Sequence, residues 1–202
     1  MKVITMIKLI TQSILQKIVW VVACGVLYPL VLTALFQLAF PRQANGSLVE
    51  RGGQVVGSVW LAQPFTDPGH FWPRPSAAGY GTGPAGIASS TGSNFGPTNA
   101  QLQTNVRANA KALREAHKLP ADAPVPADLV YASGSGLDPH ISPAAARFQI
   151  ARVAAARGMS VDQVTALVEK FIEPPQWGFL GEARVNVLLL NLALDAAAPN
   201  KA

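Results

Sequence analysis

With 202 residues, the chain is long enough for one ordinary domain plus an additional segment. Half of the residues are hydrophobic and only 13% are charged, which is apolar for a purely soluble domain, and a single cysteine excludes an internal disulfide. Three of the 16 basic residues precede residue 18, so the rest of the chain has 13 basic against 11 acidic residues. Because it also lacks basic runs interleaved with aromatics, we exclude nucleic acid as a partner.

Residues 18–40, IVWVVACGVLYPLVLTALFQLAF, form an apolar stretch without a charged residue. A helix of this length reaches about 35 Å, and the hydrocarbon core of a bilayer is about 30 Å thick. We therefore predict a single transmembrane helix over residues 18–40. A cleaved signal peptide is the alternative, but its apolar core would have about 7 to 15 residues followed by a small-x-small cleavage site, which LAFPRQ does not provide.

The two flanks of this helix differ in charge. Residues 1–17 contain three lysines and no acidic residue, whereas the flank after the helix mixes both signs. The positive-inside rule therefore places residues 1–17 in the cytoplasm and residues 41–202 outside, as an extracytoplasmic (periplasmic) domain.

Three residues of the helix indicate packing against a neighbouring helix. Thr33 and Gln37 lie four residues apart, hence on one helical face, where they could hydrogen-bond across an interface. In the alternative, Thr33 bonds its own backbone and Gln37 reaches the outer interface. Pro29 predicts a kink, which also suits packing against neighbours.

Two segments without helical periodicity follow. Valines among glycines in residues 45–65 predict one or two short strands. Glycine, proline, serine and asparagine dominate residues 70–99, which indicates a loop, and its aromatic side chains indicate that it packs on something. Long ordered loops of this kind are more often functional than decorative.

The remaining segments are predicted to be mainly helical. Thr98 and Gln101 form a capping-box pattern for a helix to about His117. Ser142 followed by proline predicts the start of a second helix, and Gly158 its end.

A second capping box, Ser160 with Gln163, predicts a third helix that ends near the EPP sequence. Residues 182–197 fit strand or helix, and their length favours helix. The predicted fold class is α+β: one N-terminal transmembrane helix followed by a mainly helical extracytoplasmic domain with a few short strands.

The stretch ASGSGLDPHISPAAA, residues 132–146, contains the ingredients of a hydrolase in Ser133, Ser135, Asp138 and His140. It matches neither a P-loop nor a nucleophile elbow. One proline separates Asp138 from His140, and this spacing makes it difficult for the two side chains to orient each other toward a serine. We favour the structural interpretation, in which the aspartate and the serines satisfy backbone donors in a tight turn.

The three histidines are scattered, and no H-x-x-x-H or C-x-x-C pair is present. We therefore predict no metal site and no catalytic residue in this chain.

Six segments occur in order behind the membrane helix: NGSLV, FWPRPSA, GSNFGPTN, ASGSGLDPHISPAAA, QIARVAAARG and FLGEARVNVLLLNLALD. Together they closely resemble the C subunit of the bacterial Kdp high-affinity potassium-transporting P-type ATPase. Trp60 and Ala62 stand where the family's isoleucine and glycine are expected, and Pro73 stands where glycine is more usual. These departures concern local turn geometry.

The resemblance implies a non-catalytic accessory subunit that crosses the bacterial inner (plasma) membrane once. Its partners would be a channel-like potassium-translocating subunit, a P-type ATPase subunit and a small single-helix subunit, besides membrane lipid. The complex would use ATP, magnesium and potassium, and no cofactor is assigned to this chain itself. The subunit would support assembly and, as a catalytic chaperone, raise the ATP affinity of the hydrolysing subunit.

If residues 41–202 lie outside, the SGSG loop cannot contact cytosolic ATP, so any effect on ATP affinity has to pass through the membrane as a coupling free energy. We predict that this loop and the preceding glycine-rich loop form the face that contacts the complex. The predicted contact residues are Arg74, Ser76, Ser93, Asn94, Ser133, Gly134, Ser135, Gly136, Asp138 and His140. A membrane-anchored exported hydrolase and a solitary extracytoplasmic ligand-binding domain remain the alternative functions.

Overall fold

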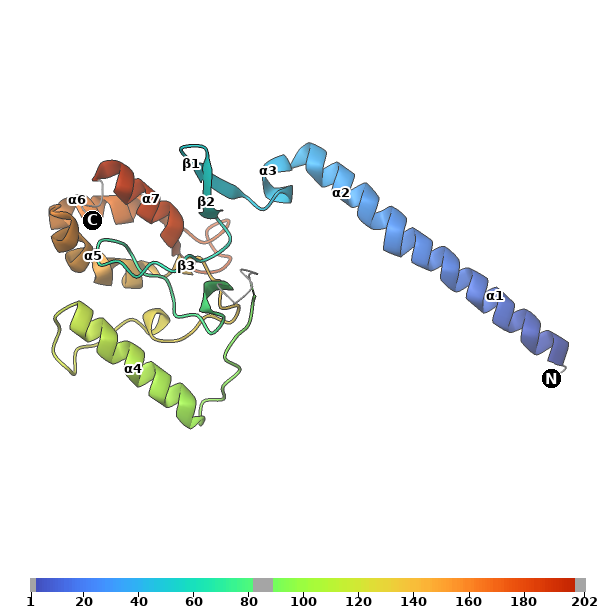
Figure 1. Ribbon diagram of the computed structural model, residues 1–202, viewed down its shortest axis with the longest axis horizontal. Coiled ribbons are helices and arrows are strands. Elements are labelled where there is room, and N and C mark those ends of the chain that lie inside the picture. The colour runs from blue at the N-terminus through green and yellow to red at the C-terminus, as the bar shows by residue number, and fades with distance from the viewer. Residues whose placement is uncertain (1–2, 82–88, 199–202) are drawn as a thin grey trace. The chain divides into compact units, whose positions relative to one another are not determined.

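The computed structural model describes residues 3–81 and 89–198 (Figure 1). Residues 82–88 of the predicted loop, and Lys2 of the N-terminal flank, lie outside the described residues. The chain divides into two units, Met1–Leu48 and Val49–Ala202, each of which has its own internal contacts.

The first unit contains one continuous helical stretch of 37 residues, Val3–Ala39, which is long and apolar enough to cross a membrane. This stretch consists of α1 (Val3–Val22), a π-helical turn (Ala23–Leu27) and α2 (Tyr28–Ala39). The predicted span over residues 18–40 occupies its C-terminal part.

The sequence predicted a kink at Pro29, and the structure has this π-helical turn just before it. The N–H of Tyr28 bonds the carbonyl of Ala23, five residues back. Proline has no N–H to donate, so a helix needs a local rearrangement where it enters, and a wider turn is one way to provide it. The helix therefore continues through Pro29 without a break (Figure 1).

A short helical turn, α3 (Pro41–Ala44), follows the long helix. Here Gln37 and Asn45 exchange two side-chain hydrogen bonds of 3.1 and 3.4 Å. Gln37 thus has a polar partner within its own chain at the helix end, while Thr33 is exposed. Contact of Pro29, Thr33 and Gln37 with another helix stays a prediction.

The described residues of the second unit form four helices and two small sheets, and Figure 1 shows how they are arranged. The helices are α4 (Ala100–Ala116), α5 (Pro143–Arg157), α6 (Val161–Lys170) and α7 (Val187–Ala197). The first sheet pairs β1 (Leu48–Arg51) with β2 (Gln54–Ser58). The second has the order β3-β5-β4, formed by β3 (His140–Ile141), β4 (Ile172–Glu173) and β5 (Arg184–Asn186). Single 3-10 turns occur at Gly79–Gly81 and Ala127–Leu129.

The core of this unit lies where α5, α6 and α7 pack together against the three-stranded sheet. The strands are antiparallel, with His140 opposite Asn186 and Ile172 opposite Val185. The side chains that are 0% exposed include Phe71, Val153, Val164, Val168, Leu190 and Leu194. Phe71 belongs to the predicted loop, so part of that loop is a core element.

Most of the predicted helix ends are confirmed. The Ser142 hydroxyl accepts the N–H of Ala145, and Gly158 ends α5 with a left-handed backbone, φ 65°. The Ser160–Gln163 capping box is present with both hydrogen bonds. These signals are local, so the sequence contains all the information they need.

Two predictions need correction. The N-cap of α4 is Asn99, not Thr98, and its side chain accepts hydrogen bonds from the N–H groups of Gln101 and Leu102. The ambiguous last segment contains both elements, because β5 runs directly into α7. Asn186 ends the strand and caps the helix by accepting the Leu189 N–H at 3.1 Å. The predicted α+β class, mainly helical with short strands, is confirmed.

Candidate functional site: a face built from two loops

The SGSG loop is held in shape by its own side chains. The Ser135 hydroxyl accepts the N–H of Leu137 at 3.1 Å, and Asp138 Oδ1 accepts the N–H of His140 at 3.0 Å. These are the tight-turn roles that the sequence predicted for the serine and the aspartate.

An ion pair joins this loop to the glycine-rich loop. Arg74 Nη1 donates to Asp138 Oδ2 at 3.0 Å, and both side chains are a little over a quarter exposed. His140 Nδ1 lies 3.6 Å from Asp138 Oδ1, so these two side chains are neighbours. Burial works against the ionised carboxylate, but the hydrogen bonds from His140 and the Arg74 cation hold the pKa of Asp138 below its usual value.

The Ser76 hydroxyl links the glycine-rich loop to the backbone of the SGSG loop. Ser76 Oγ donates to the carbonyl of Gly136 at 2.5 Å and accepts the N–H groups of Ala78 and Tyr80. The N–H of Ser133 donates to the carbonyl of Pro75 at 3.1 Å. Two independent backbone contacts therefore fix the position of the SGSG loop.

A third segment packs on the same loop so closely that glycine is needed. Ser90 Oγ donates to the carbonyl of Ser135 at 3.0 Å. A Cβ atom on Gly92 would lie 2.7 Å from the carbonyl oxygen of Gly134. A Cβ on Gly136, whose φ is 69°, would lie 2.6 Å from the carbonyl oxygen of Thr91. Both distances are too short for a side chain.

We call the surface formed by residues 74–80, 90–94 and 133–140 the loop face. A groove of about 550 Å³ runs beside it, lined by Ser76 and Ser93 from the face and by Asn105 and Val106 from α4. Asn94 is exposed and has a left-handed backbone, φ 53°. The structure thus brings the SGSG loop together with Arg74, Ser76 and Ser93.

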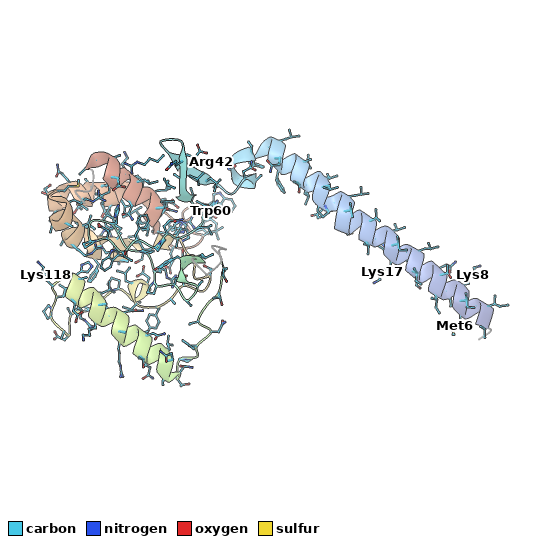
Figure 2. All side chains as sticks on the ribbon, in the orientation of Figure 1. Met6, Lys8, Lys17, Arg42, Trp60 and Lys118 are labelled. Atoms are coloured by element: carbon cyan, nitrogen blue, oxygen red, sulfur yellow. The ribbon has the colours of Figure 1, made fainter. Side chains whose placement is uncertain are left out.

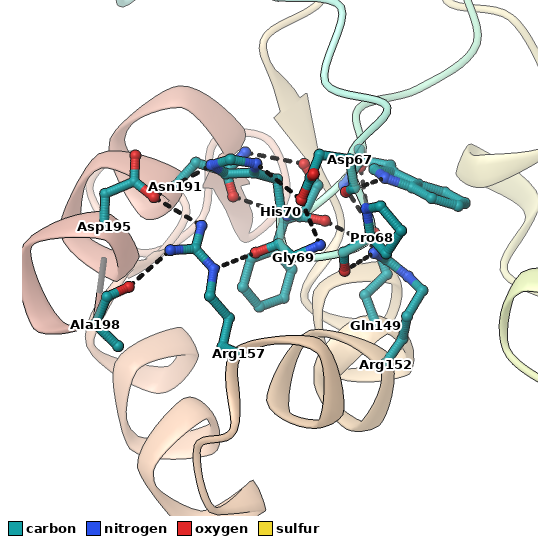
Figure 3. Close-up of polar contacts among 12 residues, drawn as sticks. Asp67, Pro68, Gly69, His70, Gln149, Arg152, Arg157, Asn191, Asp195 and Ala198 are labelled. Carbon is teal, nitrogen blue, oxygen red and sulfur yellow. Dashed lines mark hydrogen bonds and ion pairs between the residues drawn. The ribbon is translucent and has the colours of Figure 1, made fainter. Parts of the chain in front are cut away.

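The loop face is positioned by the segment Asp67–Trp72, which two amide side chains grip (Figure 3). Asn191 on α7 accepts the N–H of Phe71 at 2.8 Å and donates to the Phe71 carbonyl at 2.9 Å. Gln149 on α5 does the same for Trp72, at 2.7 and 3.1 Å. Each amide satisfies both backbone groups of one residue, as a neighbouring strand would.

Two arginines of α5 bind the carbonyl groups just before these residues (Figure 3). Arg152 donates to the carbonyls of Pro68 and His70, and its guanidinium lies 3.9 Å from the centroid of the Trp72 ring. Burial lowers the pKa of Arg152 to about 10, which leaves it cationic at neutral pH.

Arg157, whose side chain is 0% exposed, donates to the carbonyl of Gly69 at 2.6 Å and to Asp195 Oδ1 at 2.7 Å. Asp195 also lies 3.2 Å from His70 Nε2 and 3.0 Å from Arg51 Nη1. We call Gln149, Arg152, Arg157, Asn191 and Asp195 the clamp.

None of the clamp residues was among the contact residues predicted from the sequence. A signal was present, because Asn191 interrupts the apolar run LLLNLAL and both arginines interrupt the alanine-rich run ARVAAAR. A polar residue on an otherwise apolar helix face needs a buried partner. The partner itself lies about 80 to 120 residues away in sequence, as with Arg152 and Pro68 or Asn191 and Phe71, and is not visible there.

His117 stands at the edge of the clamp. Its Nε2 accepts a hydrogen bond from Arg152 Nε at 3.3 Å, and its ring centroid lies 4.4 Å from that of Phe148. Burial, followed by the neighbouring Arg152 cation, lowers the pKa of His117 to about 4. The imidazole is therefore a neutral acceptor at pH 7.

The fold and the site define a class: a membrane-anchored α+β protein that presents a preformed loop face. Within residues 3–81 and 89–198, no group of three or more His, Cys, Asp or Glu side chains could hold a metal ion.

Comparisons with known proteins identify the family. Residues 10–196 match the family model described as KdpC, the K⁺-transporting ATPase c chain. The potassium-transporting ATPase KdpC subunit of Methylococcus capsulatus is 55% identical over 192 residues, which cover 95% of this chain and 99% of that protein. The KdpC subunit of Rhodospirillum rubrum is 56% identical over 87% of this chain and 89% of its own, and that of Geobacter sulfurreducens is 50% identical over 95% and 100%.

The chain therefore belongs to the KdpC family. It is an accessory subunit of the potassium-transporting ATPase rather than the catalytic one, as the resemblance implied.

Replacing Asn191 tests the clamp. Asn191→Leu removes the amide but keeps a side chain of similar size, so the N–H and C=O of Phe71 are left buried without partners. We expect the free energy of unfolding to fall by about 2 to 4 kcal/mol. Chemical denaturation of the full chain in detergent, followed by circular dichroism, measures this loss. The matched control is Asn105→Leu at an exposed position of α4, which should change stability by about 0.5 kcal/mol or less. Equal effects of the two changes would contradict the clamp.

His117 predicts a dependence of stability on pH. Its pKa is about 4 in the folded chain and about 6.5 when unfolded, so the unfolded state binds the proton more readily. Its contribution to stability is complete above pH 6.5 and is lost as the pH falls toward 4. We expect the melting temperature of the domain to decrease over this interval, and His117→Gln, which keeps an acceptor but cannot titrate, to flatten the decrease. Lys118→Gln next to it should retain the wild-type slope, and an unchanged slope in His117→Gln would refute the assignment.

Proposed function

We propose that this chain is the assembly subunit of an ATP-driven, high-affinity potassium importer and that it acts through its loop face. Its partners would be the channel-like potassium-translocating subunit, the P-type ATPase subunit and the small single-helix subunit of the same pump. The observation that carries the proposal is the preformed loop face, joined by the Arg74–Asp138 ion pair, in a chain whose relatives are named as subunits of a potassium-transporting ATPase.

The distribution of charge supports an extracytoplasmic domain. The lysines of residues 1–17 stay in the cytoplasm under the positive-inside rule, so residues 41–202 would lie in the periplasm, beyond the inner membrane. In this arrangement the loop face can meet only the outer parts of partner subunits.

The geometry of the loop face suits docking. Hydrogen bonds from Ser76, Ser90 and Ser133 fix its backbone before any partner arrives, so little conformational entropy remains to be lost on binding. The partly exposed Arg74 and Asp138 side chains offer charge at its surface, and the adjacent groove offers a concave region for a partner's side chains. The hydrolase alternative gains no support here, because the Asp138 carboxylate is shared between Arg74 and His140.

In this proposal the chain raises the ATP affinity of the hydrolysing subunit without contacting the nucleotide. ATP, magnesium and potassium would be bound by the other subunits. A periplasmic domain can influence a cytoplasmic nucleotide site only by favouring one conformational state of the complex, which is a coupling free energy between distant sites.

Substitutions at the ion pair test the docking role. In Arg74→Ala and Asp138→Ala, we expect the domain to lose about 1 kcal/mol or less of stability, because the pair is partly exposed. Recovery of partner subunits on affinity purification from native membranes in mild detergent should fall about tenfold or more, as for an interface hot spot. Potassium uptake at low external potassium should fall with it.

The matched control is Arg147→Ala, which breaks the exposed ion pair with Glu169, at 2.7 Å, between two residues that do not belong to the loop face. It should leave assembly and uptake unchanged. If Arg74→Ala and Asp138→Ala also left both unchanged, the docking role of the loop face would be wrong.

The effect on ATP can be tested separately. Adding the purified full chain to partner subunits prepared without it should lower the KM for ATP by about 5- to 150-fold, the usual range of allosteric coupling. The full chain alone in lipid nanodiscs should show no saturable binding of ATP. Saturable binding by the isolated chain, or a KM that does not respond to it, would reject the coupling mechanism.

A further inference from the structure

The loop between β4 and β5 exposes large apolar side chains. We call residues 174–181, PPQWGFLG, the aromatic tip; it contains no charged residue. Trp177 is 85% exposed, Phe179 74% and Leu180 44%. A folded monomer rarely presents a contiguous group of this kind unless the group meets another surface.

The aromatic tip is a preformed turn. Gln176 and Leu180 exchange two backbone hydrogen bonds of 2.9 Å, and the N–H of Gly178 donates to the carbonyl of Pro175 at 3.0 Å. Trp177 has φ 53°, a left-handed backbone that is unfavourable for residues with a side chain. The fold thus maintains a strained backbone that keeps two aromatic side chains in the open.

An ion pair marks the base of the tip. Glu173 and Arg184 face each other across β4 and β5, and Arg184 Nε lies 3.0 Å from Glu173 Oε2. Both side chains are partly exposed. Polarity therefore changes sharply from the charged base to the apolar tip.

The tether to the membrane helix enters the domain close to this base. Because only Gly52 and Gly53 join β1 to β2, the start of β1 lies beside the end of β2. The end of β2 contacts the junction of β5 and α7, since Asn186 donates to the carbonyl of Val59 at 2.8 Å. From Asn186, β5 leads back to the tip over three residues, about 10 Å of strand.

Trp60 adds a further exposed aromatic side chain at this edge. It follows Val59 directly in sequence and is 54% exposed (Figure 2). The tether itself, residues 40–47, spans about 30 Å at most, because each residue contributes about 3.5 Å when extended. A tether of this length allows the edge that contains Trp60 and the tip to reach the surface of the bilayer.

We propose that the aromatic tip, together with Trp60, inserts into the headgroup region of the bilayer in which the chain's own helix is anchored. Tryptophan favours this region, since its ring is apolar and its indole N–H needs a polar neighbour. The polarity of the loop, from its uncharged tip to its ion-paired base, matches the change in polarity from acyl chains to water. Every copy of the chain is tethered to a bilayer, whether or not other subunits are present. Lipid is therefore favoured over an apolar groove of a partner protein.

The test uses the full chain in lipid nanodiscs without other subunits. Lipids brominated in the upper acyl chain quench indole fluorescence on contact. Trp20→Phe removes the indole of the membrane helix. The difference in fluorescence between this variant and the double variant Trp20→Phe with Trp177→Leu isolates the emission of the tip. We expect brominated lipid to remove most of this emission, and we expect its spectrum in ordinary lipid to be blue-shifted from that of an indole in water.

The matched control places a tryptophan elsewhere on the same domain. Val161→Trp, in the chain with Trp20→Phe and Trp177→Leu, puts it at the start of α6, where residue 161 is 53% exposed. That position is one helix of about 15 Å away from β4, so its emission should not be quenched.

Tip emission that is equal in ordinary and brominated nanodiscs would overturn the proposal, as would equal quenching of the Val161→Trp control. If the tip became shielded only after co-assembly with partner subunits, it would be a protein contact instead. No other subunit is present in the nanodisc experiment, so its outcome is independent of the proposed pump function.

Discussion

The structure depends on two amide side chains that hydrogen-bond a segment with no neighbouring strand. Phe71 and Trp72 pass through the interior in an irregular conformation, where unpaired N–H and C=O groups would cost about 1 to 3 kcal/mol each. Asn191 and Gln149 each satisfy both groups of one residue, and so do the work of a sheet from two different helices. Since this segment runs directly into Arg74, the clamp that completes the core also determines where the loop face stands.

Charge inside this core is tolerated because it is distributed over many partners. The Arg157 side chain is fully buried, and its guanidinium donates to two carbonyls and to the Asp195 carboxylate. Burial works against the ionised form of Asp195, but the hydrogen bond from Arg157 and the nearby cations hold its pKa below the usual value. Breaking one member of such a buried set leaves an uncompensated charge, so the set stabilises one arrangement of α5, α7 and the segment before the loop face.

The helix ends were predictable from sequence because a cap depends on neighbours within four residues, as at Ser142, Gly158 and Ser160. Thr98 and Asn99 both suit an N-cap, and only the backbone of the preceding loop decides between them. Strand β5 depends on pairing with Ile141 and Ile172, which lie 44 and 13 residues before their partner Val185. The SGSG turn was predictable for the same local reason. Its attachment to Arg74 and Ser76, and the grip of Asn191 on Phe71, are long-range contacts that no local pattern encodes.

The π-helical turn before Pro29 also affects how the membrane helix can be used. An α-helix advances about 100° per residue, so one additional residue in a single turn rotates everything after it by about that angle relative to everything before it. The stripe that contains Thr33 and Gln37 is therefore not continued along the same side of α1. A single straight neighbour could not follow one stripe along the whole helix, so the two halves of this anchor present separate surfaces to whatever surrounds them in the bilayer.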